Sequence, residues 1–112
     1  MFSKIDTVHI CVRDLDQSIN WYEEVLELEN LFYAGKYVVF RVGLGNTTIT
    51  IQEGEVRPSS IKPILFSDAL EETRLKLLEK DVEAGAIESD GEVTFFEFKD
   101  LDGNIFEVCH FD

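Results

Sequence analysis

The sequence is poor in basic residues and has an excess of acidic ones. It holds 10 Lys and Arg against 23 Asp and Glu, for a formal net charge of −13 at pH 7. A field of this sign repels phosphate backbones and anionic lipid surfaces, so nucleic acid and membranes are not expected as partners. It either favours a cationic ligand or simply keeps the protein in solution.

Long apolar runs and cysteine are also scarce. No segment approaches the roughly 20 consecutive apolar residues of a membrane span. The opening residues, MFSKIDTVHICVRD, lack the apolar stretch and cleavage site of a signal peptide. The two cysteines, Cys11 and Cys109, are therefore expected to be free thiols in a cytoplasmic protein.

Several common functional motifs are missing. The chain has no glycine-rich phosphate loop, no Cys-x-x-Cys pair and no serine nucleophile elbow. What it does have is a normal supply of core residues, because 45% of its 112 residues are hydrophobic and nine are Phe. This length and composition predict one domain, residues 1–112, with one core.

The first half of the chain predicts a strand, a helix and three more strands. Residues 7–12 alternate Val8, Ile10 and Val12 with Thr7, His9 and Cys11, which indicates a half-buried strand. Asp14 or Asp16 is expected to cap a helix whose apolar positions are Ile19, Tyr22, Val25 and Leu26. Strands are expected near residues 31–34, 37–42 and 47–52, with Gly and Asn in the turns.

The second half repeats this order. A short strand at residues 62–67, with Ile64 and Phe66 on one face, precedes a helix that Asp68 caps and that ends near Lys80. Leu70, Leu77 and Leu78 are its core candidates. A weak strand near residues 86–87 and strong strands at 93–99 and 105–111 complete the pattern.

The repeat predicts an α+β fold made of two βαβββ units, residues 1–53 and 62–112, joined by a linker at 54–61. The pattern Ile10-x-Val12-x-Asp14 returns as Ile64-x-Phe66-x-Asp68, and Gly45-Asn46 returns as Gly103-Asn104. We expect curved mixed sheets around a cavity, with the helices outside.

Two segments resemble the vicinal-oxygen-chelate superfamily, which includes glyoxalases, bleomycin resistance proteins and extradiol dioxygenases. HICVRDLDQSINWYEEVLELE is similar to its opening strand and helix, and FFEFKDLDGNIFEV is similar to its closing strand pair. Leu101 stands where proline is usual in the closing turn. The resemblance covers nearly the whole chain.

In metal-using members of this superfamily, ligands from the first and last strands of each unit hold one divalent ion. By resemblance His9 and Glu107 match two of these positions, as metal ligands or as catalytic acid and base. A His and a carboxylate suit Zn, Ni, Mn or Fe. The other positions fall on Pro63 and on Thr48, Ile49 or Thr50, none of which is a strong ligand. The alternative for His9 is a hydrogen-bonded cavity histidine.

Further candidates for ligand binding lie on the same strand faces. Thr50 and Gln52 would line the cavity if Ile49 and Ile51 face the helix, and Arg41 would bind a ligand carboxylate or pair with a surface acid. Cys11 and Cys109 share the His9 and Glu107 sides as small apolar fillers or, for Cys109, as a ligand. Glu97 pairs with Glu107 or is a solvated surface residue. His110 points away from Glu107 and is expected to be peripheral.

Two functions remain open, and whether the chain is an enzyme stays undecided. The first is a small-molecule-binding protein of bleomycin-resistance type, with a metal-free cavity for a neutral or cationic ligand. The alternative is a divalent-metal-dependent lyase, isomerase or dioxygenase that chelates vicinal oxygens of a small substrate. Either is expected to be a homodimer.

Overall fold

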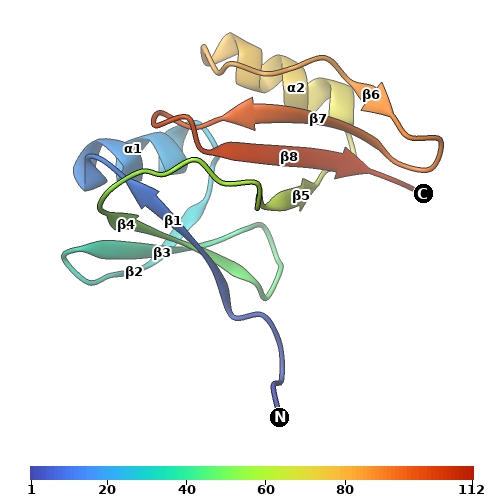
Figure 1. The fold of residues 1–112 in the computed structure, drawn as a ribbon. Coiled ribbons are helices and arrows are strands. Elements are labelled where there is room, and N and C mark those ends of the chain that lie inside the picture. Colours follow the sequence, from blue (N-terminus) through green and yellow to red (C-terminus); the bar gives the residue numbers. More distant parts are fainter. The chain divides into compact units, whose positions relative to one another are not determined.

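The computed structural model describes all residues, 1–112, and they divide into two compact units. Unit 1 is Met1–Arg57 and unit 2 is Pro58–Asp112, coloured blue to green and green to red in Figure 1. Each unit has its own sheet and helix, and each is described by itself below.

Unit 1 contains one helix and four strands. These are β1 (Thr7–Val12), α1 (Leu15–Glu24), β2 (Glu29–Tyr33), β3 (Tyr37–Arg41) and β4 (Thr48–Glu53). The strand order in the sheet is β1-β4-β3-β2. The first pair, β1 and β4, is parallel and the other two pairs are antiparallel.

Unit 2 repeats this arrangement. Its elements are β5 (Ile64–Phe66), α2 (Leu70–Glu79), β6 (Glu88–Ser89), β7 (Thr94–Lys99) and β8 (Ile105–His110). The order β5-β8-β7-β6 matches that of unit 1, again with one parallel pair, β5 and β8. The prediction of two βαβββ units, each a mixed sheet with one helix, is confirmed.

In unit 1 the face of the sheet that packs on α1 is apolar. Ile49 and Ile51 of β4 are buried, and the side chains of Thr50 and Gln52 point to the opposite side of the strand. Tyr22 of α1 stacks on Phe40 with ring centroids 5.7 Å apart. Removing these side chains from water is the main stabilising contribution that the alternation of β1, β3 and β4 provides.

The largest buried side chains in the core of unit 2 are phenylalanines. Phe96, Phe98 and Phe106 are each at most 2% exposed. Phe98 and Phe106, directly opposite each other on β7 and β8, stack at 5.0 Å. Aromatic cross-strand pairs of this kind stabilise a sheet beyond their buried area.

The two helices begin differently. Asp14 caps α1, because its carboxylate accepts a hydrogen bond from Gln17 N at 3.0 Å. The prediction that Asp68 caps α2 is wrong: Ala69 is the N-cap residue and makes no side-chain cap bond. Instead the Ser67 hydroxyl accepts a hydrogen bond from Ala69 N, at 3.1 Å.

The second helix also corrects one core candidate. Leu70 and Leu77 are buried, but Leu78 is 38% exposed. Two residues seven apart return to one face of a helix, whereas the next residue is turned by about 100°. The weak strand also shifts: β6 is Glu88–Ser89 rather than residues 86–87.

The sequence echo between β1 and β5 is misaligned by one residue in the structure. Ile10 and Val12 are core residues, whereas Ile64 and Phe66 are 57% and 50% exposed. In β5 it is Leu65 that pairs with the core residue Val108. No helix in the structure is long and apolar enough to span a membrane.

Candidate functional site

We use the term open face for the side of each sheet that is turned away from the buried core residues of its own unit. On sheet 1 the register places the open-face residues side by side, His9 opposite Thr50 and Cys11 opposite Gln52. Tyr37 and Arg41 of β3 pair with Gln52 and Thr48 and belong to the same face. Strand alternation therefore groups five predicted site residues on one surface: His9, Cys11, Arg41, Thr50 and Gln52.

Two hydrogen bonds organise this face. His9 Nε2 lies 2.7 Å from Gln52 Oε1, and because the amide oxygen only accepts, the ring nitrogen donates. The Thr7 and Thr50 hydroxyls share a hydrogen bond of 2.8 Å. The result is a row of hydrogen-bonding groups across β1 and β4.

Arg41 is engaged within its own sheet. Its Nε donates to Glu29 Oε2 at 3.1 Å, and its Nη2 reaches the same oxygen. Of the two partners that the sequence left open for Arg41, the surface acid is the one observed. The pair is half exposed, so it contributes little to stability.

The open face of sheet 2 carries the predicted acidic residues. Glu97 of β7 lies directly opposite Glu107 of β8, and Ile64 of β5 lies on the other side of Glu107. Cys109, two residues further along β8, is buried and pairs with Phe66 and Phe95. The structure thus brings Glu97, Glu107 and Cys109 onto one face.

A lysine that the sequence analysis did not select completes this cluster. Lys62 Nζ lies 3.2 Å from Glu107 Oε1 and also forms an ion pair with Glu97 Oε2. Hydrogen bonds to Glu97 and then to Glu107 raise the pKa of Lys62 above its usual range. The ammonium group therefore stays charged at neutral pH.

Lys62 lies just before β5, on the side of the chain that faces Glu107. Glu107 N donates a hydrogen bond to the Pro63 carbonyl at 3.0 Å, which holds the chain before β5 against β8. Since Ile64 shares the face of Glu107, alternation puts residue 62 on that face and residue 63 on the other. Corrected by one residue, the echo places Ile64 beside Glu107, and Lys62 reaches the same carboxylate from two residues earlier in the chain.

Burial affects the Cys109 thiol. Burial raises the pKa of Cys109, and the negative charge of the nearby Glu107 carboxylate raises it further by a smaller amount. Neither Cys109 nor Cys11 is in a disulfide. Both effects favour the protonated thiol at neutral pH.

The side chains around Glu107 do not fit a divalent metal ion. In neither unit do three or more His, Cys, Asp or Glu side chains gather into a group that could hold one. The Lys62 ammonium lies at the Glu107 carboxylate, where a cation would bind, and His9 is hydrogen-bonded to an amide.

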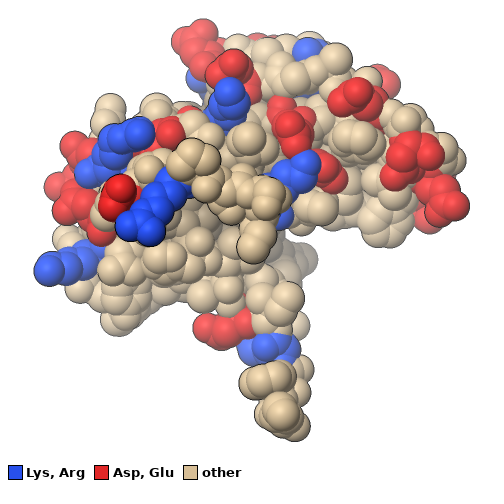
Figure 2. Space-filling view, viewed as in Figure 1, with Lys and Arg blue, Asp and Glu red and all other residues tan.

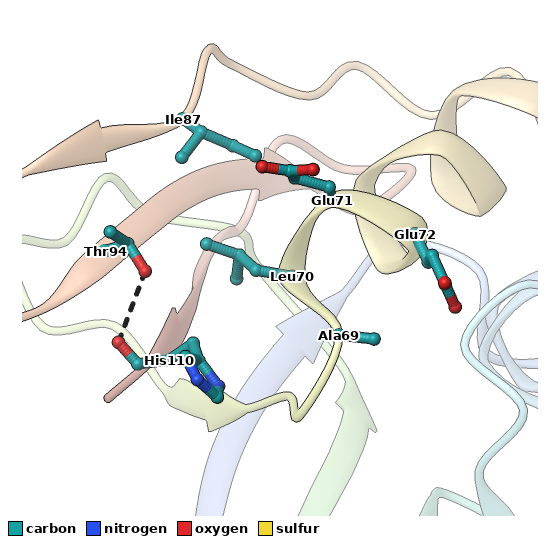
Figure 3. Close-up of a pocket in the computed structure, with 7 residues that line it drawn as sticks. All are labelled: Ala69, Leu70, Glu71, Glu72, Ile87, Thr94 and His110. Carbon is teal, nitrogen blue, oxygen red and sulfur yellow. Dashed lines mark hydrogen bonds between the residues drawn. The ribbon is translucent and has the colours of Figure 1, made fainter. Parts of the chain in front are cut away.

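A separate pocket of about 290 Å³ lies on the helix side of sheet 2 (Figure 3). Its walls come from the first turn of α2, the segment before β6, and the facing ends of β7 and β8. The lining residues are Ala69, Leu70, Glu71, Glu72, Ile87, Thr94 and His110.

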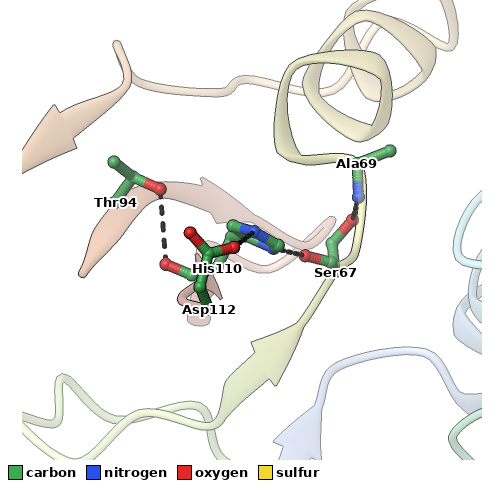
Figure 4. A network of polar contacts seen from close by, with 5 residues as sticks. All are labelled: Ser67, Ala69, Thr94, His110 and Asp112. Atoms are coloured by element: carbon green, nitrogen blue, oxygen red, sulfur yellow. Dashed lines mark hydrogen bonds and ion pairs between the residues drawn. The ribbon is translucent and has the colours of Figure 1, made fainter. Parts of the chain in front are cut away.

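His110 belongs to this pocket, away from the open face as predicted. Its Nδ1 lies 2.8 Å from the Ser67 carbonyl oxygen and therefore donates to it (Figure 4). Its Nε2 lies 3.4 Å from Asp112 Oδ1, and Thr94 Oγ1 donates to the His110 carbonyl at 3.3 Å. These contacts tie the end of β8 to the chain between β5 and α2.

Acidic side chains are numerous on the face shown in Figure 2. Basic side chains lie among them at the left and in the centre, whereas the right-hand end of this face carries acidic side chains alone.

Comparison with known proteins supports the resemblance. Residues 4–108 match the model of the glyoxalase/bleomycin resistance protein/dioxygenase superfamily. The chain belongs to this superfamily. No curated protein sequence matches the chain significantly.

Several solved structures share this fold at low identity. TnmS3, an antibiotic-binding protein from Streptomyces sp. CB03234, has a TM-score of 0.88 and 17% identity, with 99% of this chain and 98% of that one covered. A putative glyoxalase family protein from Bacillus anthracis has a TM-score of 0.85 and 18% identity, covering 100% and 98%.

A third structure contains a metal ion. It is a mutant of the fosfomycin resistance protein FosX from Listeria monocytogenes, complexed with Mn(II) and 1S,2S-dihydroxypropylphosphonic acid. Its TM-score is 0.79 at 20% identity, with 96% of this chain and 90% of that one covered. At these identities the three likenesses show the fold alone.

Proposed function

We propose that the chain is a small-molecule-binding protein whose open sheet faces bind a neutral or cationic organic ligand without a metal ion. The observation that carries this proposal is the row of hydrogen-bonding groups on sheet 1, His9 with Gln52 and Thr7 with Thr50. Such groups orient a ligand by hydrogen bonds, while an aromatic neighbour supplies contact area.

The rest of that face supports an organic ligand. Tyr37 pairs with Gln52 across β3 and β4, and its ring contacts Phe32 with centroids 6.2 Å apart. Two aromatic rings beside hydrogen-bonding side chains suit a flat ligand, and a ring face also attracts a cation. The net negative charge of the chain also favours a cationic ligand.

The known relatives support the same class of function. TnmS3 is an antibiotic-binding protein, so this fold accommodates organic ligands of that kind. At 17% identity the ligand of TnmS3 cannot be assigned to this chain, so its specificity has to be measured directly. Cys11 and Thr50 would border the same ligand, since they neighbour His9 and Gln52 in the register.

The test is a thermal-shift screen of neutral and cationic aromatic compounds, bleomycin among them, followed by calorimetry on the hits. We expect His9→Ala and Gln52→Ala each to weaken a hit about tenfold, the value of one lost hydrogen bond. Gln17→Ala removes an exposed glutamine from α1 and is the matched control. Hits that bind all four proteins equally would contradict the proposal.

The alternative function is a divalent-metal-dependent lyase, isomerase or dioxygenase. It is supported by the Mn(II) complex of FosX and by the presence of His9 and Glu107, which would act as ligands or as acid and base. Against it stands the Lys62 ion pair at Glu107. Turnover of an α-keto or catechol substrate that is lost on chelation would establish the enzyme.

We also propose a homodimer. Each sheet ends on strands with one unpaired backbone edge, such as β1 and β2 of sheet 1, and exposed edges favour pairing with another chain. Exposed Phe66 and Phe111, whose rings contact each other with centroids 5.0 Å apart, add apolar surface beside β5. Light scattering at micromolar concentration measures the oligomeric state.

A further inference from the structure

The starting point is a repulsive pair on the open face of sheet 2. Glu97 and Glu107 are direct cross-strand neighbours on β7 and β8. Like charges placed opposite each other destabilise a sheet. Glu107 has only 14% of its side chain exposed, so water screens it weakly, whereas Glu97 is 47% exposed.

Lys62 compensates this pair. Its ammonium contacts both carboxylates, Glu107 Oε1 at 3.2 Å and Glu97 Oε2. The three groups form a compact cluster of one positive and two negative charges, with only a third of the lysine side chain exposed.

The backbone fixes the lysine in this position. The bond from Glu107 N to the Pro63 carbonyl and the pairing of Ile64 with Glu107 anchor the chain on both sides of residue 63. The backbone therefore already holds Lys62 on the face of Glu107. Its side chain loses little conformational entropy when the ammonium group contacts both carboxylates.

We propose that Lys62 is a built-in cation that takes the place of a divalent metal ion at Glu107. The inference rests on the proposed metal-free function and deepens it. The lysine neutralises the carboxylate that matches the superfamily's metal-ligand position, and a second cation at that oxygen would be repelled by the ammonium. The open face of sheet 2 then presents a fixed ammonium group instead of a metal site.

The test measures Mn(II) binding to the full, chelator-treated chain by electron paramagnetic resonance, with no organic ligand present. We expect the wild-type protein to bind Mn(II) no tighter than millimolar. Lys62→Met removes the charge but keeps most of the stem, and it should bind Mn(II) at least tenfold tighter. The double variant Lys62→Met/Glu107→Gln should lose that gain.

Lys99→Met is the matched control. Lys99 lies on the same strand face as Glu97 and is paired with Glu83 at 4.0 Å, not with Glu107. Lys99→Met changes the net charge by the same amount as Lys62→Met but leaves the Lys62 ion pairs in place. Its Mn(II) affinity should therefore equal that of the wild type. Circular dichroism melts establish that each variant is folded.

Two results would overturn the proposal. One is a folded Lys62→Met with the Mn(II) affinity of the wild type. The other is micromolar Mn(II) binding to the wild type that Glu107→Gln abolishes, a measurement that needs no lysine variant. Neither depends on the compound screen, so the proposed function and this inference can fail separately.

Discussion

Asp81 adopts a backbone conformation that costs free energy. Its φ is 61°, in the left-handed region that favours glycine. Val82 N donates to the Leu77 carbonyl at 3.0 Å and Asp81 N donates to the Leu78 carbonyl at 3.1 Å. This is the Schellman arrangement that ends α2, with Asp81 at the position where glycine is usual.

Asp81→Gly should therefore stabilise the protein. The change removes the left-handed strain and an unfavourable negative charge at the helix C-terminus, so we expect the free energy of unfolding to rise by about 1 kcal/mol. Urea denaturation measures it. Asp81→Ala keeps the strain and removes the charge, so it should gain less; an equal gain in both variants would assign the effect to charge alone.

At the scale of the element, the turn between β7 and β8 depends on one carboxylate. Asp100 is 7% exposed, and its side chain accepts hydrogen bonds from Asp102 N at 2.9 Å, Asn104 N at 2.8 Å and Asn104 Nδ2 at 2.8 Å. Gly103 supplies the positive φ of 85° that the turn needs. This is the physical basis of the closing Asp-x-Asp-Gly-Asn motif.

Asp100→Ala should destabilise the chain by about 2–4 kcal/mol, because several backbone and side-chain donors lose their acceptor at once. The midpoint of urea unfolding reports the loss. Asp68→Ala is the matched control, since that exposed carboxylate does not cap α2, and it should stay within about 0.5 kcal/mol. A large loss of unfolding free energy in Asp68→Ala would contradict the assignment of Asp68 as a residue that does not cap α2.

The strands and helices were predictable where the apolar period is strong. The bounds of β1 follow from alternation alone, and β3, β4, β7 and β8 differ from expectation by a residue or two. Alternation also placed His9, Glu97 and Glu107 away from their core-facing neighbours. It failed in β5, which has three residues, because so short a run does not fix which face is buried.

At the scale of the whole molecule, self-repulsion follows from the charge of −13. Many acidic groups are exposed on the face shown in Figure 2, and salt weakens repulsion between exposed charges. We expect the melting temperature to rise by a few degrees between about 20 mM and about 300 mM potassium chloride, where roughly 1 kcal/mol corresponds to about 4–8 °C. A fall in melting temperature would mean that attractive pairs such as Lys62 with Glu107 dominate.

The sequence by itself determined the fold class and the family, because both depend on local periods and on turn residues that are read in order. Alternation also separated the two sides of β7 and β8, with Phe96, Phe98 and Phe106 on the side away from Glu97 and Glu107. Only the tertiary structure showed that Arg41 is paired with Glu29 and that Lys62 forms an ion pair with Glu107. These contacts join residues 12 to 45 positions apart through strand register, and register depends on hydrogen bonding between whole strands rather than on any local signal.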